Sequence, residues 1–322
     1  MATLTTTLTA YRTRRFSLSL VSAKPSPLLN LPAELVLDIL ESVLSQVKPS
    51  TLSTISKVIS RFVDIILYRT VVLHSKESLI LFHRTTLSRS PAFFASHVKK
   101  LVVAYKPHNA VNYHRAQRSI AVCGGARSLL LSMWFGSDCL ASVMEGRTDG
   151  GVSEITLHST DGIEAPIYLP AQNQKELQLA DIVSDSITHL RICEPGEVWV
   201  SPEDTLLPFG ALLNLTHLQL SRRTNSNSDN DLIFQLQVRS ILQTHPALSV
   251  LAVVIYPQLW AADEDVSESD IWVMMHQVAE QDGRLRLVEG KNDDWATQWR
   301  NGGSNVGSRF WADLSKCSGA LS

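Results

Sequence analysis

Seven short apolar triplets recur along the chain between residues 101 and 287. In each triplet two large aliphatic residues flank a middle position, and successive triplets begin 26 to 35 residues apart. Short β-branched and aliphatic runs of this kind predict strands. One strand and its returning segment cannot enclose a core, so such units must stack and share one. The triplets are Leu101–Val103, Leu129–Leu131, Ile155–Leu157, Leu190–Ile192, Leu218–Leu220, Leu251–Val253 and Leu285–Leu287.

The segments around the triplets predict a mixed α/β fold. Thr70–Leu73 is β-branched and short, which predicts one further strand. Helical periodicity over 76–87, 112–122, 232–242 and 271–278 predicts helices between strands. Two polar stretches, Ser221–Asp231 and the acidic Ala262–Asp270, are expected to be loops. The aromatic pair Phe310 and Trp311 is expected to pack as a terminal cap, with Trp295 and Trp299 nearby.

The composition sets broad limits on function. The 322 residues are 44% hydrophobic and 19% charged, with a net charge of -2, which suits one large core or two domains. This balance gives no reason to expect nucleic acid or an anionic membrane as a partner. No apolar run approaches the about 20 residues that cross a bilayer. Four widely spaced cysteines without a CxxC pair indicate reduced thiols and an intracellular setting.

Residues 1–27 differ from the rest of the chain. They contain no acidic residue but several arginines among many serines and threonines. A segment this polar is typical of a disordered tail. The same composition overlaps with that of a mitochondrial transit peptide, which remains an alternative.

A pair of helices is predicted between Leu31 and Tyr68. Pro32 is well placed as the first helical residue, and Glu34 falls in the first turn, where a carboxylate meets the positive end of the helix dipole. The apolar residues that follow cover more than the single stripe a surface helix needs. Lys48-Pro49 ends this helix, and Ser50 is a suitable N-cap for a second. The surplus apolar surface either packs on the rest of the chain or binds another protein.

This stretch resembles the F-box. The matching residues are Leu31-Pro32-x-Glu34-Leu35-x-x-x-Ile39-Leu40, then Leu52 and Val58-Ile59-Ser60-Arg61-Phe62. The F-box is a small helical unit that docks on the Skp-type adaptor of a cullin ubiquitin ligase. The resemblance implies adaptor-binding anchors at Leu31, Pro32, Leu35, Ile39, Leu40, Leu52 and Val58.

Most of the chain resembles fungal F-box proteins that carry irregular leucine-rich-like repeats. Three of the six triplet intervals fall within the about 20–29 residues of such repeats, and three are longer. The expected organisation is a basic tail at 1–27, an F-box-like module at 28–70 and an irregular leucine-rich-repeat-like solenoid of parallel strands and helices at 71–322. The alternative is a generic α/β domain with regularly spaced strands.

The resemblance implies a substrate-recognition adaptor of a Skp–cullin–F-box ubiquitin ligase, working in the cytoplasm or nucleus. The alternative is a ligase-independent repeat scaffold for protein–protein interaction. The histidines show no zinc-binding spacing, and GxSxG, P-loop and GxGxxG motifs are absent from the sequence. We therefore expect no catalytic, metal or cofactor site, and a hydrolase-like α/β enzyme is the third possibility.

Four polar residues mark a candidate target face. Arg191 and Gln219 are the middle residues of neighbouring triplets, so they point away from the core by the two-residue period of a strand. His189 and His217 precede the same triplets and share that direction. The four residues therefore either hold a target protein or merely solvate an exposed sheet.

Overall fold

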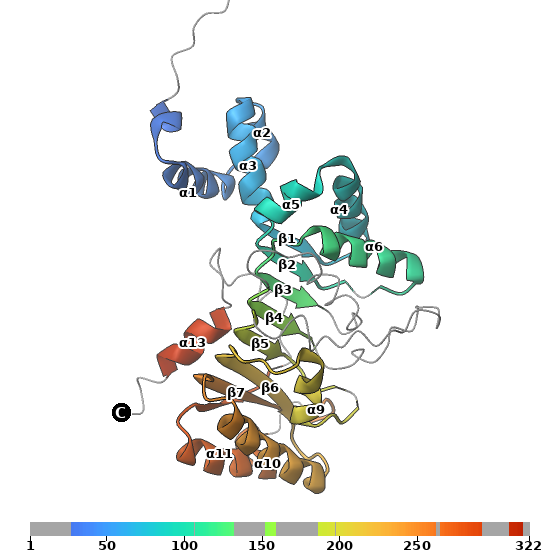
Figure 1. Ribbon diagram of the computed structural model, residues 1–322, viewed down its shortest axis with the longest axis vertical. Helices are drawn as coiled ribbons and strands as arrows, with labels where there is room; N and C mark the ends of the chain where they lie inside the picture. The colour runs from blue at the N-terminus through green and yellow to red at the C-terminus, as the bar shows by residue number, and fades with distance from the viewer. Residues whose placement is uncertain are drawn as a thin grey trace, which may run out of the picture. The chain divides into compact units, whose positions relative to one another are not determined.

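The computed structural model describes residues 27–105, 107–131, 152–158, 186–196, 198–261, 265–291 and 309–317 (Figure 1). Residue contacts divide the chain into two units, Met1–Val63 and Asp64–Ser322. The expected tail falls outside the described residues except for Pro27, and so do Trp295 and Trp299.

The first unit contains the short 3₁₀ turn η1 (Pro27–Asn30), the helices α1 (Ala33–Leu44) and α2 (Pro49–Ser53), and the start of α3 (Lys57–Arg69). Pro32 is the N-cap of α1 rather than its first helical residue, with φ -50° and ψ 144°. Its carbonyl accepts the first helical hydrogen bond, from Val36 N–H at 3.1 Å. The helix therefore starts one residue later than expected, and proline suits the N-cap because it contributes a fixed φ and an acceptor but needs no donor there.

The second predicted helix is interrupted. The helix starts at Pro49, not Ser50, and stops after Ser53; α3 then begins at Lys57. The hydroxyl of Ser56 accepts a hydrogen bond from Ile59 N–H at 3.1 Å, which gives α3 a capping residue of its own. A side-chain cap therefore begins a new helix within a stretch whose apolar periodicity predicted a single helix.

Among its described residues, the second unit has eight parallel strands in a single sheet, and each strand pairs with the next one along the chain. This confirms the predicted mixed α/β class and the seven triplet strands. The strands are β1 (Thr70–Leu73), β2 (Lys100–Val103), β3 (Ser128–Leu131), β4 (Glu154–Leu157), β5 (His189–Ile192), β6 (His217–Arg223), β7 (Val250–Tyr256) and β8 (Leu285–Glu289).

The triplets are in register across the sheet. Each first residue lies directly opposite the first residue of the neighbouring triplet, from Leu101 and Leu129 through to Leu251 and Leu285. These residues all point to one face and join a single buried cluster. Because side chains alternate along a strand, the middle residues of the triplets lie on the opposite face.

Helices bury their apolar sides in the same cluster as the triplets. They include α4 (Lys76–Ser88), α5 (Pro91–His97), α6 (Ala110–Val122), α9 (Pro202–Leu206), α10 (Ser228–Thr244) and α11 (Asp270–Gln281). Short 3₁₀ turns, η3 (Leu207–Phe209) and η4 (Val266–Glu268), adjoin α9 and α11. The last helix, α13 (Arg309–Cys317), lies against the other face, where it contacts β5 and β6 (Figure 1).

The loop expected at Ser221–Asp231 is mostly regular structure. Ser221 to Arg223 extend β6, and α10 begins at Ser228, so only four residues connect them. Asn227 caps α10 by accepting hydrogen bonds from the N–H groups of Asp229 and Asn230. The prediction was wrong because turn-forming residues here serve as a helix start. In the acidic stretch, 262–264 lie outside the described residues, and η4 and the start of α11 follow.

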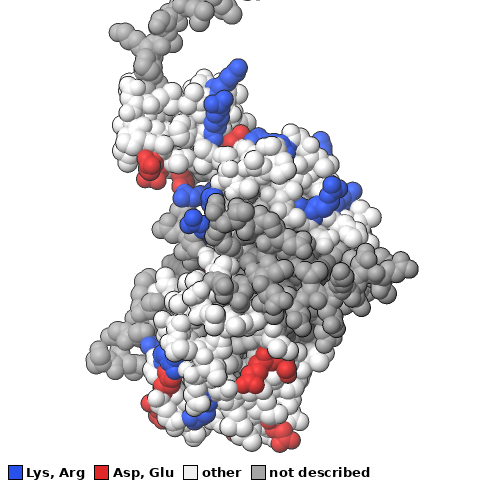
Figure 2. Space-filling model, in the orientation of Figure 1, with Lys and Arg blue, Asp and Glu red and all other residues white. Residues whose placement is uncertain are grey.

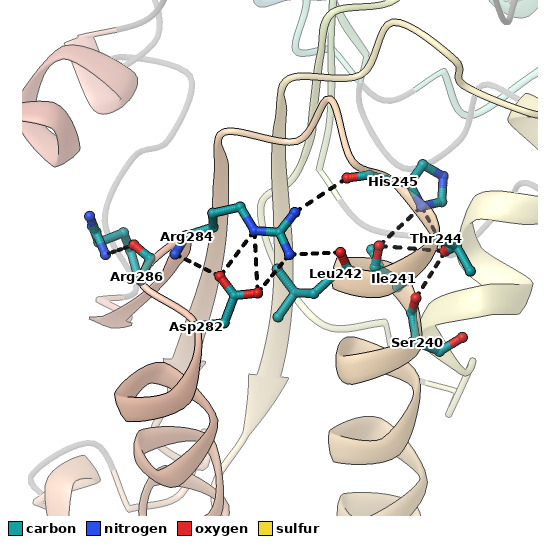
Figure 3. Close-up of polar contacts among 9 residues, drawn as sticks. Ser240, Ile241, Leu242, Thr244, His245, Asp282, Arg284 and Arg286 are labelled. Atoms are coloured by element: carbon teal, nitrogen blue, oxygen red, sulfur yellow. Dashed lines mark hydrogen bonds and ion pairs between the residues drawn. The ribbon is translucent and has the colours of Figure 1, made fainter.

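An arginine closes the end of α10. Arg284, just before β8, donates to the carbonyl of Leu242 at 2.7 Å and to that of His245 at 3.5 Å (Figure 3). Asp282 pairs with the same guanidinium at 2.6 Å. A cation at these carbonyls suits the negative end of the helix dipole. The contact joins the end of α10 to the strand that follows α11.

Replacing Arg284 by methionine is expected to lower the free energy of unfolding by about 1–2 kcal/mol. A hydrogen bond to a charged group contributes about 1.5–3 kcal/mol, and partial solvent exposure reduces that value. Arg239→Met is the matched control, since Arg239 lies on α10 and donates to the neutral Gln281 at an exposed position. Chemical denaturation should show a change within about 0.5 kcal/mol for the control. Equal losses for the two variants would contradict this role of Arg284.

Candidate functional site

The first unit exposes a stripe of apolar side chains that centres on α1. Leu35 and Ile39 stand one helical turn apart on α1 and are 49% and 41% exposed, and Leu31 precedes them at 40%. Val58, in the first turn of α3, is 43% exposed. The neighbouring stripe of α1, Val36 and Leu40, is buried. Helix α1 therefore carries two apolar stripes, of which one remains accessible to a partner.

The expected anchors divide into two groups. Leu31, Pro32, Leu35, Ile39 and Val58 are exposed, so their side chains are free to contact another protein. Leu40 and Leu52 are buried. An amphipathic helix uses some of its apolar residues for its own packing, and adaptor contact by the seven residues stays a prediction.

The second unit brings the four residues of the target face together. His189 lies opposite His217, and Arg191 lies opposite Gln219, in the paired strands β5 and β6. Arg191 Nε donates to Gln219 Oε1 at 2.5 Å, and Gln219 Nε2 donates to the carbonyl of Ile192 at 3.1 Å. The predicted juxtaposition is therefore present, and the side chains are linked to one another.

The target face is covered rather than open. Arg191 and Gln219 are 4% and 1% exposed. The ring of Phe310, in α13, lies 3.9 Å from the Arg191 guanidinium carbon, and Trp311 packs edge-on against both histidine rings. Phe310 and Trp311, which were expected to form a terminal cap, instead pack on the target face. Sequence periodicity predicts which face of the sheet a side chain points to. It does not predict that a helix distant in the sequence packs over that face, so the burial of Arg191 and Gln219 was not foreseen.

The two histidines form a stacked, neutral pair. Their ring centroids are 4.2 Å apart and the planes differ by 9°. Thr188 and Thr216 each donate their hydroxyl to a carbonyl of the preceding strand segment, and each lies within 2.9 Å of the Nδ1 of the next residue. The histidine Nδ1 therefore donates to the threonine oxygen, and this network assigns the neutral ring's proton to Nδ1.

Burial disfavours the charged form of both rings. It lowers the pKa of His189 below its usual value. Burial, and then the neighbouring His189, lower the pKa of His217 to about 4, against an opposing effect of Glu154 on β4. Val250 of β7, the register partner of His217 on its other side, has no charge. The pair is thus uncharged at neutral pH and fits beneath an aromatic ring.

Stability should fall as the pH drops from 6.5 towards 4. Over that range the unfolded chain protonates His217 while the folded chain does not, so protonation favours unfolding, by up to about 1.4 kcal/mol per pH unit for one group. His217→Gln should reduce this slope. His276→Gln, at an exposed position on α11, should leave it unchanged. Denaturation curves across the range measure the slopes, and identical slopes in wild type and H217Q would contradict the assignment.

Sequence reasoning missed the length of the polar row beside the histidines. Lys100, Ser128 and Glu154 occupy the equivalent position on β2, β3 and β4, and all three are buried. Ser128 donates to Glu154 Oε2 at 2.7 Å. Aligning the residue that precedes each triplet would have revealed the row, because it is a register position of the sheet.

Tyr256 and Glu194 extend the target face towards the carboxyl ends of the strands. Tyr256 donates to the carbonyl of Cys193 at 2.5 Å, and burial raises its pKa. Gly290 leaves room for that ring, since a Cβ there would lie 2.6 Å from Tyr256 atoms. A small cavity of about 160 Å³ lies between these residues and Phe310. The face is therefore not filled completely by α13.

A larger hollow of about 500 Å³ lies at the carboxyl ends of β5, β6 and β7. Trp199 and Phe234 contribute aromatic walls, and Arg222 stacks on Trp199 at 4.2 Å. Buried Asp231 neutralises Arg222 at 2.7 Å. The size matches that of ligand pockets, about 300–1,000 Å³. No sequence motif pointed to it, because its residues come from separate loops.

The remaining features concern metal ligands, cysteines and membrane spans in the part of the chain that is described. No cluster of three or more possible metal ligands occurs among those residues. Cys123 caps the end of α6 and is buried, as expected for a helix terminus. No helix within the described ranges is both long and apolar enough to span a bilayer. Figure 2 shows small separate groups of basic and acidic side chains on the face drawn.

A scan against protein-family models finds none that fits the chain, and a search of curated proteins finds no similar sequence.

Proposed function

We propose that this chain is the substrate-recognition subunit of a Skp–cullin–F-box type ubiquitin ligase. The first unit docks on the Skp-type adaptor, and the second unit holds the protein to be ubiquitinated. The chain positions its target and performs no covalent step itself. It works in the cytoplasm or nucleus.

The exposed apolar stripe on α1 carries the proposal. Leu31, Leu35 and Ile39 follow one another at four-residue spacing, and each is at least 40% exposed. A helix that presents apolar residues at such spacing is suited to a hydrophobic groove on another protein. These residues belong to the stretch Leu31-Pro32-x-Glu34-Leu35, which resembles the start of an F-box. Pattern and exposure thus agree on the same side chains.

The arrangement of the sheet supports the second half of the proposal. Eight parallel strands follow one another in chain order, with one neighbour added at each step. Stacked strand–helix repeats produce this order, since each repeat contacts the repeats beside it. Repeats of this kind present extended surfaces for protein partners. An irregular leucine-rich-like solenoid is accordingly the proposed form of the second unit.

Assembly from purified components tests this function. The full-length chain, a Skp-type adaptor and the amino-terminal part of a cullin are mixed and analysed by size-exclusion chromatography with light scattering. The proposal predicts a ternary complex with one copy of each component. Elution of the chain separately from the adaptor–cullin pair would contradict it, and would leave a ligase-independent scaffold as the better hypothesis.

A further inference from the structure

We propose that the target face, formed by His189, Arg191, His217 and Gln219, binds a partner segment carrying two adjacent aromatic residues, and that α13 is its resident occupant. The partner displaces α13 and places its own rings where Phe310 and Trp311 now lie. The identification of this partner as the ligase target rests on the proposed function. The binding of two adjacent aromatic residues to the target face does not depend on that function.

The contacts of α13 show what the target face accepts. Phe310 presents its ring to the Arg191 guanidinium at 3.9 Å, a cation–π contact. Trp311 packs edge-on against both histidines, with its ring centroid 5.2 Å from that of His217 and 5.8 Å from that of His189. Aromatic pairs prefer such tilted arrangements. The two neighbouring subsites therefore select two consecutive aromatic side chains.

The polar groups beneath the rings are held in place independently of α13. Gln219 fixes the Arg191 guanidinium from the side, and Thr188 and Thr216 orient the histidine rings. The surface is therefore preorganised, which reduces the entropy cost of binding an incoming segment. The adjoining cavity of about 160 Å³, lined by Tyr256 and Lys291, leaves space for a residue next to the aromatic pair.

Helix α13 is suited to exchange with a partner. It has nine residues, and isolated helices shorter than about 12–15 residues are marginal in water. Ala312 and Asp313 are exposed on it. Such a short helix depends on its contacts with the target face, so a segment that makes the same contacts can take its place.

A peptide of this chain's own sequence tests the inference. Residues 309–317, with Cys317→Ser and an amino-terminal fluorophore, are titrated with the full-length protein, and anisotropy reports binding. In the variant Phe310→Ala/Trp311→Ala the face is vacated, so we expect saturable binding. Wild type should bind at least about tenfold more weakly, because its tethered helix competes at an effective concentration near millimolar. A peptide with alanine in place of both aromatic residues is the control and should not bind.

The inference would be overturned by no saturable binding to the double variant, or by equal affinity for the double variant and wild type. Adding Arg191→Ala to the double variant should weaken peptide binding at least about fivefold, and no change would also count against it. If the double variant lacks a cooperative melting transition, Trp311→Leu, which keeps an apolar side chain, replaces it. Adaptor binding is measured on the same proteins, so failure of the proposed function is seen separately.

Discussion

Replacing Leu35 and Ile39 together by aspartate is expected to lower the affinity for a Skp-type adaptor by at least about 100-fold. Burial of one leucine or isoleucine contributes about 1.5–3 kcal/mol, and 1.4 kcal/mol corresponds to a factor of ten. A carboxylate in the same groove adds a desolvation cost. Both residues are more than 40% exposed, so the chain's own fold should tolerate the change. Biolayer interferometry with immobilised adaptor measures the affinity.

A matched control separates charge from contact. Ser42 and Gln46 are exposed polar residues at the far end of α1 and just beyond it. Ser42→Asp with Gln46→Glu adds the same two negative charges to the carboxyl-terminal end of the same helical face, without replacing an apolar residue of the stripe. Its affinity should stay within about threefold of wild type. A loss of similar size in both double variants would assign the effect to net charge and contradict docking through the stripe.

Asp231→Ala is expected to reduce the free energy of unfolding by about 3–5 kcal/mol. Asp231 accepts from Arg222 Nε at 2.8 Å and pairs with Nη2 at 2.7 Å, and the two side chains are 5% and 8% exposed. Without the carboxylate, the guanidinium stays buried against Trp199 without its counter-ion. The cost is mainly that uncompensated charge. Urea denaturation of the full-length chain measures it.

An exposed ion pair of the same composition provides the comparison. Arg89 pairs with Asp64 at 3.0 Å, but these side chains are 34% and 30% exposed. Water solvates both partners there, so Asp64→Ala should cost less than about 1 kcal/mol. Equal losses for Asp231→Ala and Asp64→Ala would show that burial does not set the strength of the Arg222 pair.

The strands were predictable because their signal is local. Alternation within each triplet fixes which side chains share a face, and that alone placed Leu101 through Leu285 on the buried face. The helix boundaries were close for the same reason: the predicted 76–87 became α4, and the predicted 271–278 became α11. The parallel pairing follows from units that return to the same side of the sheet.

Long-range contacts were not predictable from pattern. Helix α13 reaches His217 from more than ninety residues further along the chain. Asp231 was interpreted as part of a loop, although it lies in α10 and neutralises Arg222 of β6. In both cases the contact joins residues in separate elements of the fold, so it can be seen only once the chain has folded. The exposed stripe on α1 is intermediate: its residues were identified, but burial alone distinguished Leu35 from Leu40.

Titration calorimetry of a Skp-type adaptor into the full-length wild-type chain tests the central claim most directly. The account predicts a stoichiometry of one and a dissociation constant at or below about 1 µM. It also predicts a negative heat-capacity change between two temperatures, because the exposed stripe on α1 becomes buried. No binding heat at either temperature, with adaptor at tens of micromolar, would contradict the claim.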